Sequence, residues 1–174
     1  MYKGRPKLKL QPRPLDRLLN RLALAGLLFS WGYTLFHYSN LPQIIPIHYN
    51  LSGEVDGYGN KMIIWLLPSI LTLVFGGISW ISRYPELFNY PQTITPENAG
   101  RHYRAGTRVL SWVNLVIVFL LFYITYKIIQ GAYRGNAPLE WWFVPLLIIL
   151  LMAPSIGFWV SLRKSSSKDQ DTGK

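Results

Sequence analysis

Four long apolar runs, separated by short polar segments, set the pattern of this chain. They are Leu18–His37, Met62–Ile81, Val109–Ile129 and Trp141–Leu162. Each run supplies about 20 helical residues, the length needed to cross a hydrocarbon core of about 30 Å. The polar sequence between the runs is too short to cover four such helices in water. The pattern therefore predicts an all-α integral membrane protein with four transmembrane helices.

The segment between the first two runs, Leu41–Lys61, differs from both. Its sequence LPQIIPIHYNLSGEVDGYGNK alternates apolar and polar residues from Ile45 to Ser52, which is the period of an extended strand. Proline at positions 42 and 46 disfavours a helix. Ser-Gly at 52–53 and Asp-Gly at 56–57 then predict turns, because glycine accepts positive φ at no steric cost. We expect an extended loop between helices 1 and 2.

The linker after the second run contains a helix start at TPEN. Thr95 is placed as the N-cap, and Pro96 takes the first helical position. From Pro96 the helix can continue into the third run without a break, giving a length of about 52 Å. That exceeds the bilayer core, so its first turns should project beyond the membrane.

The basic residues indicate which way the helices face. Of 18 Lys and Arg, against 8 Asp and Glu, seven lie in the first 21 residues, four in the linker before the third run and four after the fourth run. The three others are Lys61, Lys127 and Arg134. Short Lys- and Arg-rich segments stay in the cytoplasm, so both termini should be inside and the 41–60 and 131–140 segments outside. This topology, N-in and C-in, explains the net charge of +10 without a nucleic-acid partner.

The expected location is a cell inner (plasma) membrane, and the first partner is the bilayer itself. Arg101, Arg104 and Arg108 share one helical face at i, i+3 and i+7. We expect them to contact anionic lipid headgroups at the inner surface, with docking of another protein as the alternative.

Polar side chains gather in the outer loop, where His48, Asn50, Glu54 and Asp56 fall within nine positions. One histidine and two carboxylates can ligate a divalent cation, but a second histidine at motif spacing is missing from the sequence. Hydrolase motifs are missing as well, and there is no cysteine. We therefore expect no catalytic residue, metal or cofactor, and interpret the loop as a recognition surface. Its residues are His48, Asn50, Glu54, Asp56, Gly57 and Tyr58.

Within the apolar runs, polar residues are sparse. Asn114 is expected to hydrogen-bond to a neighbouring helix, and Lys127 to extend its ammonium group toward the outer interface. A small-residue face for close packing is expected on the second run, at Ser69, Thr72, Gly76 and Gly77. A transporter would need paired ionisable residues near the midplane, and the sequence offers none there.

The outer loop closely resembles the signature of domain-of-unknown-function family 1648, through LP…IP.H.N..GE.DGYG.K. The linker NYPQTITPENAGRHYRAG, residues 89–106, is similar to the stretch that follows this domain in many members. The family forms the N-terminal part of SdpI-like membrane proteins, a bacterial immunity family against a secreted killing factor. SdpI-like proteins that confer immunity carry a further C-terminal membrane region beyond the four spans expected here. The resemblance implies a bacterial inner-membrane protein.

These observations divide the chain into four parts. They are a basic cytoplasmic leader at 1–17, a family-1648-like region at 18–106, a second transmembrane helix pair at 107–162 and a polar cytoplasmic tail at 163–174. The expected function is a non-catalytic, multi-pass membrane protein whose outer loop 41–61 recognises a ligand, such as a toxin or peptide, in an immunity role. The alternative is an accessory or packing subunit of a larger membrane complex, with a membrane-protein partner. A small transporter is the third hypothesis.

Overall fold

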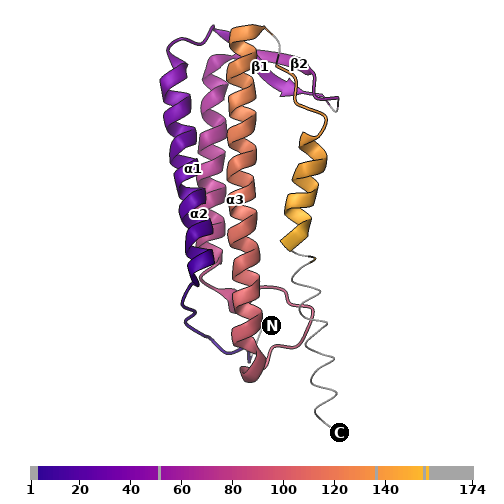
Figure 1. Ribbon diagram of the computed structural model, residues 1–174. Helices are drawn as coiled ribbons and strands as arrows, with labels where there is room; N and C mark the ends of the chain where they lie inside the picture. Colours follow the sequence, from indigo (N-terminus) through magenta and orange to yellow (C-terminus); the bar gives the residue numbers. More distant parts are fainter. Residues whose placement is uncertain (1–3, 51, 136, 155, 157–174) are drawn as a thin grey trace.

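The computed structural model describes residues 4–50, 52–135, 137–154 and 156. The chain is mostly helical, with one two-stranded sheet. Three long helices lie side by side, and a fourth, shorter helix runs along α3 (Figure 1). The helices are α1 (Pro14–Tyr38), η1 (Lys61–Trp65), α2 (Leu66–Ile81), η2 (Pro85–Leu87), α3 (Pro96–Arg134) and Phe143–Pro154; the strands are β1 (Ile44–Tyr49) and β2 (Val55–Asn60).

The first helix starts at a proline and packs closely against α3. Pro14 takes its first position, and the Asp16 carboxylate accepts the Arg13 backbone N–H at 3.1 Å. Further along, a side chain at Gly26 would place its Cβ 2.7 Å from Val118 Cγ1 of α3. The missing side chain lets the two helix backbones approach each other, the role that small residues play in membrane helix pairs.

The second apolar run is not one uniform helix. It begins as the 3₁₀ helix η1, where the Asn60 side chain accepts the Met62 N–H at 2.9 Å, and becomes α-helical at Leu66. On the predicted small-residue face, Thr72 Oγ1 accepts the Trp31 indole N–H of α1 at 3.0 Å, whereas Cβ atoms at Gly76 and Gly77 would meet nothing within 4 Å. The glycine that permits a close helix contact is Gly26, on α1.

The predicted continuous helix from Pro96 is confirmed by α3, which has 39 residues. The Asn98 side chain accepts the Thr95 backbone N–H at 2.9 Å, and Gly135 ends the helix in a left-handed conformation at φ 78°. At 1.5 Å per residue α3 is about 58 Å long. The proposed boundary at 106/107 lies inside it. Asn114 forms the predicted interhelical bonds, to Phe75 O at 3.4 Å and Ser79 Oγ at 3.3 Å on α2.

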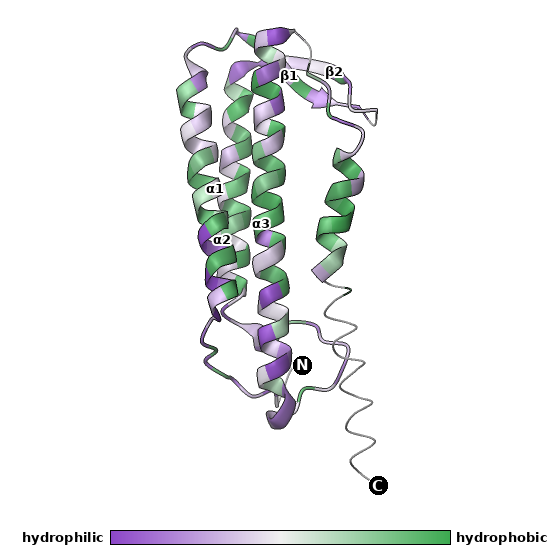
Figure 2. Cartoon of the chain, viewed as in Figure 1, coloured by the Kyte–Doolittle hydropathy of each residue, from purple (hydrophilic) through white to green (hydrophobic). Residues whose placement is uncertain are grey.

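By length and composition, two helices in the described part of the chain could cross a membrane: Lys61–Ile81 and α3. Phe143–Pro154 is a shorter apolar helix, and positions 155 and 157–162 of the predicted fourth run lie outside the described residues. Figure 2 shows hydrophobic residues along the middle of α3 and hydrophilic ones toward its lower end. Crossing by all four runs stays a prediction.

The sheet is an antiparallel hairpin in which Ile45 pairs with Gly59 and Tyr49 with Val55. The predicted strand is confirmed by β1. The predicted turn at Asp56–Gly57 is wrong, because both residues belong to β2, where Gly57 pairs with His48. A Cβ at Gly57 would lie 2.9 Å from His48 Cβ, so this glycine admits the facing side chain. The turn is made at Gly53, with φ 81°.

The two ends of the bundle carry different parts of the chain. The hairpin and the segment 137–140 lie at the upper end in Figure 1. The described leader, the linker 82–95 and the first turns of α3 lie together at the lower end. The structure thus separates the two polar surfaces that the sequence singled out.

Candidate functional site

The hairpin is fixed to the upper end of the helical bundle (Figure 1) by its apolar side. Ile45 is fully buried and belongs to a cluster with Ile64 and Ile129. Pro46, predicted to share the polar side of the strand, is instead buried, and its Cγ lies 3.0 Å from where a Cβ at Gly131 would be. The strand is therefore covered on both sides at Ile45 and Pro46, and its register becomes irregular only beyond Pro46, around His48.

The four polar residues of the predicted recognition surface form two pairs on this hairpin. His48 Nδ1 lies 2.5 Å from Asp56 Oδ1, with both side chains largely exposed. Asn50 donates its side-chain amide to Glu54 Oε2 at 3.2 Å, and Asn50 Oδ1 accepts the Glu54 backbone N–H at 2.9 Å. These hydrogen bonds hold the four polar side chains in place, so that they present a defined pattern of donors and acceptors to solvent.

The other two predicted residues, Gly57 and Tyr58, lie on β2 beside them. Gly57 faces His48, and Tyr58 faces Pro46 with 57% of its surface exposed. Among the described residues, no three His, Asp or Glu side chains come together as metal ligands would. An exposed aromatic ring next to ionic and amide groups is a combination suited to binding polar organic ligands such as peptides.

Tyr49 lies on the covered side of the same hairpin. Burial raises the pKa of its phenol to about 12, and Glu140 and Tyr58 add to this effect. Its hydroxyl is buried and finds no hydrogen-bond partner among the described residues. Tyr49 therefore acts as a neutral packing residue under the exposed surface.

Sequence reasoning missed the contribution of the segment before the last helix. Leu139 donates its backbone N–H to Gly53 O at 2.7 Å, which ties this segment to the hairpin turn. Glu140 accepts from Lys127 Nζ at 3.0 Å and from the Tyr123 hydroxyl. The Lys127 side chain, of which only 10% is exposed, thus extends its ammonium group to Glu140 at the end of the bundle that carries the hairpin. A usable signal existed: Glu140 is the single acidic residue between 131 and 140.

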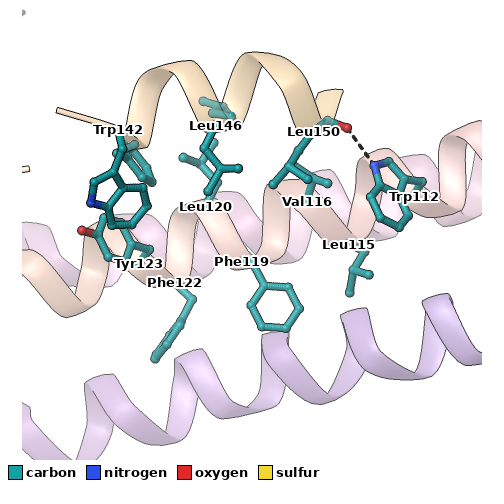
Figure 3. A pocket seen from close by; sticks show the side chains of 12 residues that line it. Trp112, Leu115, Val116, Phe119, Leu120, Phe122, Tyr123, Trp142, Leu146 and Leu150 are labelled. Atoms are coloured by element: carbon teal, nitrogen blue, oxygen red, sulfur yellow. Dashed lines mark hydrogen bonds between the residues drawn. The ribbon is translucent and has the colours of Figure 1, made fainter. Parts of the chain in front are cut away.

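An apolar groove of about 430 Å³ lies between α3 and the helix Phe143–Pro154 (Figure 3). Leu120 and Phe119 of α3 and Leu146 of the last helix line it, with Trp142 at one end. At the other end Trp112 donates its indole N–H to Leu150 O at 2.7 Å. The last helix is thus held at both ends of the groove, with apolar side chains between.

The three arginines predicted to contact lipid occupy different environments at the lower end of the bundle. Arg101 is exposed. Arg104 lines a polar cavity between the helices. Arg108 donates from Nε to the buried Asp16 carboxylate of α1 at 2.9 Å. The structure therefore places them on the same part of α3 without giving them the same surroundings.

The described leader packs against the linker and α3, which charge counting did not anticipate. Arg5 donates to the backbone carbonyls of Glu86 at 3.1 Å and Phe88 at 2.6 Å. The Tyr103 hydroxyl of α3 donates to Pro6 O at 3.0 Å. The described leader is therefore a folded part of the lower end of the bundle.

Comparison with known proteins finds a family match over the part of the chain that contains the hairpin. Residues 25–72, which include the hairpin, match the family described as Domain of unknown function (DUF1648). The chain is also 26% identical over 178 residues to an uncharacterized protein of Archaeoglobus fulgidus (strain ATCC 49558 / DSM 4304 / JCM 9628 / NBRC 100126 / VC-16), covering 92% of this chain and 96% of that one. No solved structure matches.

Proposed function

We propose that this protein is a non-catalytic, multi-pass protein of the cell inner membrane whose outer hairpin, within residues 41–61, recognises a ligand. Four helices cross the bilayer, with both termini and the linker 82–95 in the cytoplasm. The ligand class is a secreted peptide or toxin, and the biological role is immunity against it.

The separation of the two ends supports this orientation. At the lower end the described leader, the linker and the start of α3 carry most of the described basic residues, whereas the hairpin end carries Lys61, Lys127 and Arg134. Membrane insertion keeps basic segments in the cytoplasm, which places the hairpin outside. At about 37 Å, α1 is long enough to cross the core although it carries Arg17 and Arg21 near its start.

One observation carries the recognition proposal: the polar pairs stand on a hairpin that is anchored on its other side. His48–Asp56 and Asn50–Glu54 are exposed, while Ile45 beneath them is fully buried. A surface that is ordered before binding loses less conformational entropy when a ligand arrives. Exposed ion pairs add little to stability, so their arrangement is available for recognition.

Cysteine labelling tests the orientation, because the natural chain has no cysteine. Ser52→Cys in the hairpin turn and Asn89→Cys in the linker are both at exposed positions. An impermeant maleimide applied to intact cells should label the first and not the second, and lysed cells should label both. The reverse pattern in intact cells would overturn the proposed orientation.

Culture supernatants of competing organisms test whether the hairpin recognises a secreted peptide. Cells carrying His48→Ala/Asp56→Ala should become sensitive to a secreted peptide that cells with the natural chain resist, at equal membrane levels of the protein. Asn89→Ala/Gln92→Ala, two exposed changes in the linker, is the matched control and should preserve resistance. If deletion of the whole gene changes sensitivity to no supernatant in a broad panel, peptide immunity is rejected.

A second candidate function, an accessory subunit of a membrane complex, is favoured by the groove between α3 and the last helix. Its lining is apolar along α3, and the last helix exposes large side chains such as Ile148, Ile149 and Met152. Purification in a mild detergent separates the hypotheses. A membrane partner recovered at equal stoichiometry supports the subunit, and a peptide bound to the hairpin supports recognition.

A further inference from the structure

A cavity of about 340 Å³, lined mainly by polar and charged residues, lies at the lower end of the bundle, between α1, the end of α2 and α3. Part of its wall comes from the leader residues Leu10, Gln11 and Pro12, so the folded leader helps to form it. Its lining includes Arg83, just after α2, and Arg104, on α3. Two arginine residues from separate elements therefore line one space.

The balance of charge in this cavity is positive. Its acidic lining residue, Asp16, is already engaged by Arg108 Nε at 2.9 Å and by the Arg13 backbone N–H at 3.1 Å. Arg83 and Arg104 line the same space without a carboxylate partner among the described residues. An anion that enters can thus meet two cations, while the one carboxylate is neutralised by a third.

The cavity wall offers further polar groups. Asn20 and Ser79 line the cavity, and the Ser79 hydroxyl already accepts from the Asn114 amide, which leaves its own proton to donate. Asn114 Oδ1 is buried and unpartnered in the described part of the chain. The cavity thus continues the polar positions of α2 and α3 toward the membrane interior.

We propose that this cavity binds a phosphate group, with Arg83 and Arg104 as its principal ligands. Each guanidinium carries five N–H donors in a planar fork that matches two phosphate oxygens. Basic pockets between transmembrane helices on the cytoplasmic side are suited to lipid phosphates. Two sources share this chemistry, an anionic phospholipid headgroup and a soluble phosphate. The lipid source rests on the orientation proposed above.

Lipid binding to the purified full-length protein in a non-ionic detergent tests the site. Phosphatidylglycerol, phosphatidylcholine and inorganic phosphate are titrated separately, with binding followed by native mass spectrometry and by the increase in thermal midpoint. Arg83→Gln/Arg104→Gln removes the two ligands. Lys7→Gln/Arg17→Gln is the matched control, since it removes two exposed charges from the same end without touching the cavity lining.

The lining variant should bind phosphatidylglycerol about 30-fold more weakly, at about 1 kcal/mol for each arginine. The control should keep the natural affinity. Equal loss in both variants would assign binding to the overall charge of this end, and no loss in the lining variant would overturn the site. If the double variant does not fold, the single variants Arg83→Gln and Arg104→Gln should each weaken binding about fivefold.

Comparison of the separate ligand titrations distinguishes the source of the phosphate. Protection by phosphatidylglycerol that inorganic phosphate neither reproduces nor displaces assigns the cavity to lipid, whereas saturation by inorganic phosphate assigns it to a soluble ligand. If neither ligand protects the protein, the proposal is overturned. Measurement in detergent makes the result independent of membrane orientation and of the outer hairpin, so failure here and failure of peptide recognition are separate outcomes.

Discussion

Lys127 on α3 and Glu140 before the last helix form an ion pair at 3.0 Å, with the lysine nearly covered and the carboxylate 41% exposed. The two partners therefore differ in what their removal leaves behind. Glu140→Gln leaves an ammonium group with little access to water, whereas Lys127→Met leaves a carboxylate that water still reaches.

We expect Glu140→Gln to destabilise the protein by about 2–3 kcal/mol and Lys127→Met by about 1 kcal/mol or less. The double variant should be closer to the natural chain than Glu140→Gln alone. Thermal unfolding in detergent measures these differences. Equal effects of the two single changes would contradict the asymmetry.

The pair of Arg108 and Asp16 joins α3 to the start of α1. Asp16 is buried, so Arg108→Gln should cost about 2 kcal/mol by leaving the carboxylate with the Arg13 backbone N–H alone. A double-mutant cycle with Asp16→Asn measures the coupling, which we expect at about 1–2 kcal/mol. Additive single effects would indicate that the two side chains do not interact in solution.

Gly53 needs both its backbone conformation and its missing side chain. Its φ is 81°, and a Cβ there would lie 2.5 Å from Leu139 O. Gly53→Ala should lower stability by about 1–2 kcal/mol and loosen the contact between hairpin and segment 137–140. Gly76→Ala, in a helix with open space around the glycine, is the control and should be neutral or stabilising. Differential scanning fluorimetry compares the two.

The raised pKa of Tyr49 predicts that the folded protein loses stability at alkaline pH. Its pKa is raised to about 12, so the folded chain keeps the phenol neutral while the unfolded chain ionises near pH 10. Its contribution to stability is therefore complete below pH 10 and declines as the pH rises toward 12. Tyr49→Phe should reduce this decline. At neutral pH it should be neutral or stabilising, because it removes a buried hydroxyl without a partner.

Unfolding midpoints of both proteins between pH 7 and 12 check this expectation. Tyr58→Phe is a suitable control, because this ring is exposed on the same hairpin. A decline in the Tyr49→Phe protein as steep as in the natural chain would show that other groups cause it.

Arg5 should protect the leader from cleavage by proteases. Its two bonds to backbone carbonyls hold residues 5 and 6 against the linker. Arg5→Gln should speed tryptic cleavage after Lys7 and Lys9 about tenfold, since local opening becomes easier by about 1.5 kcal/mol. Arg17→Gln, an exposed change on α1, should leave the rate unaltered. Mass spectrometry of timed digests measures both rates.

The sequence predicted features that depend on local chemistry. The start of α3 at Thr95 and Pro96, its uninterrupted length and the strand at β1 all follow from neighbouring residues. Asn114 was assigned correctly because a buried amide in an apolar helix must find a partner on another helix. The gathering of six predicted recognition residues on one hairpin follows from their closeness in sequence.

Features set by distant contacts were not predictable from local pattern. Gly57 looks like a turn glycine, and only the pairing with His48 shows that it serves a strand. Which glycine faces a neighbouring helix depends on helix rotation, which is why Gly26 and not Gly76 makes the contact. The packing of the leader joins residues more than 80 positions apart, beyond the reach of charge counting.

The unbroken course of α3 has a mechanical consequence. Pro46 of the hairpin rests on Gly131 near one end of this helix, and Pro6 of the leader is bonded to Tyr103 near the other. In the orientation proposed above, α3 reaches both sides of the bilayer, and a stiff rod cannot tilt at one end while the other end stays still. A push on the hairpin that tilts α3 should therefore also move the leader on the opposite side of the membrane.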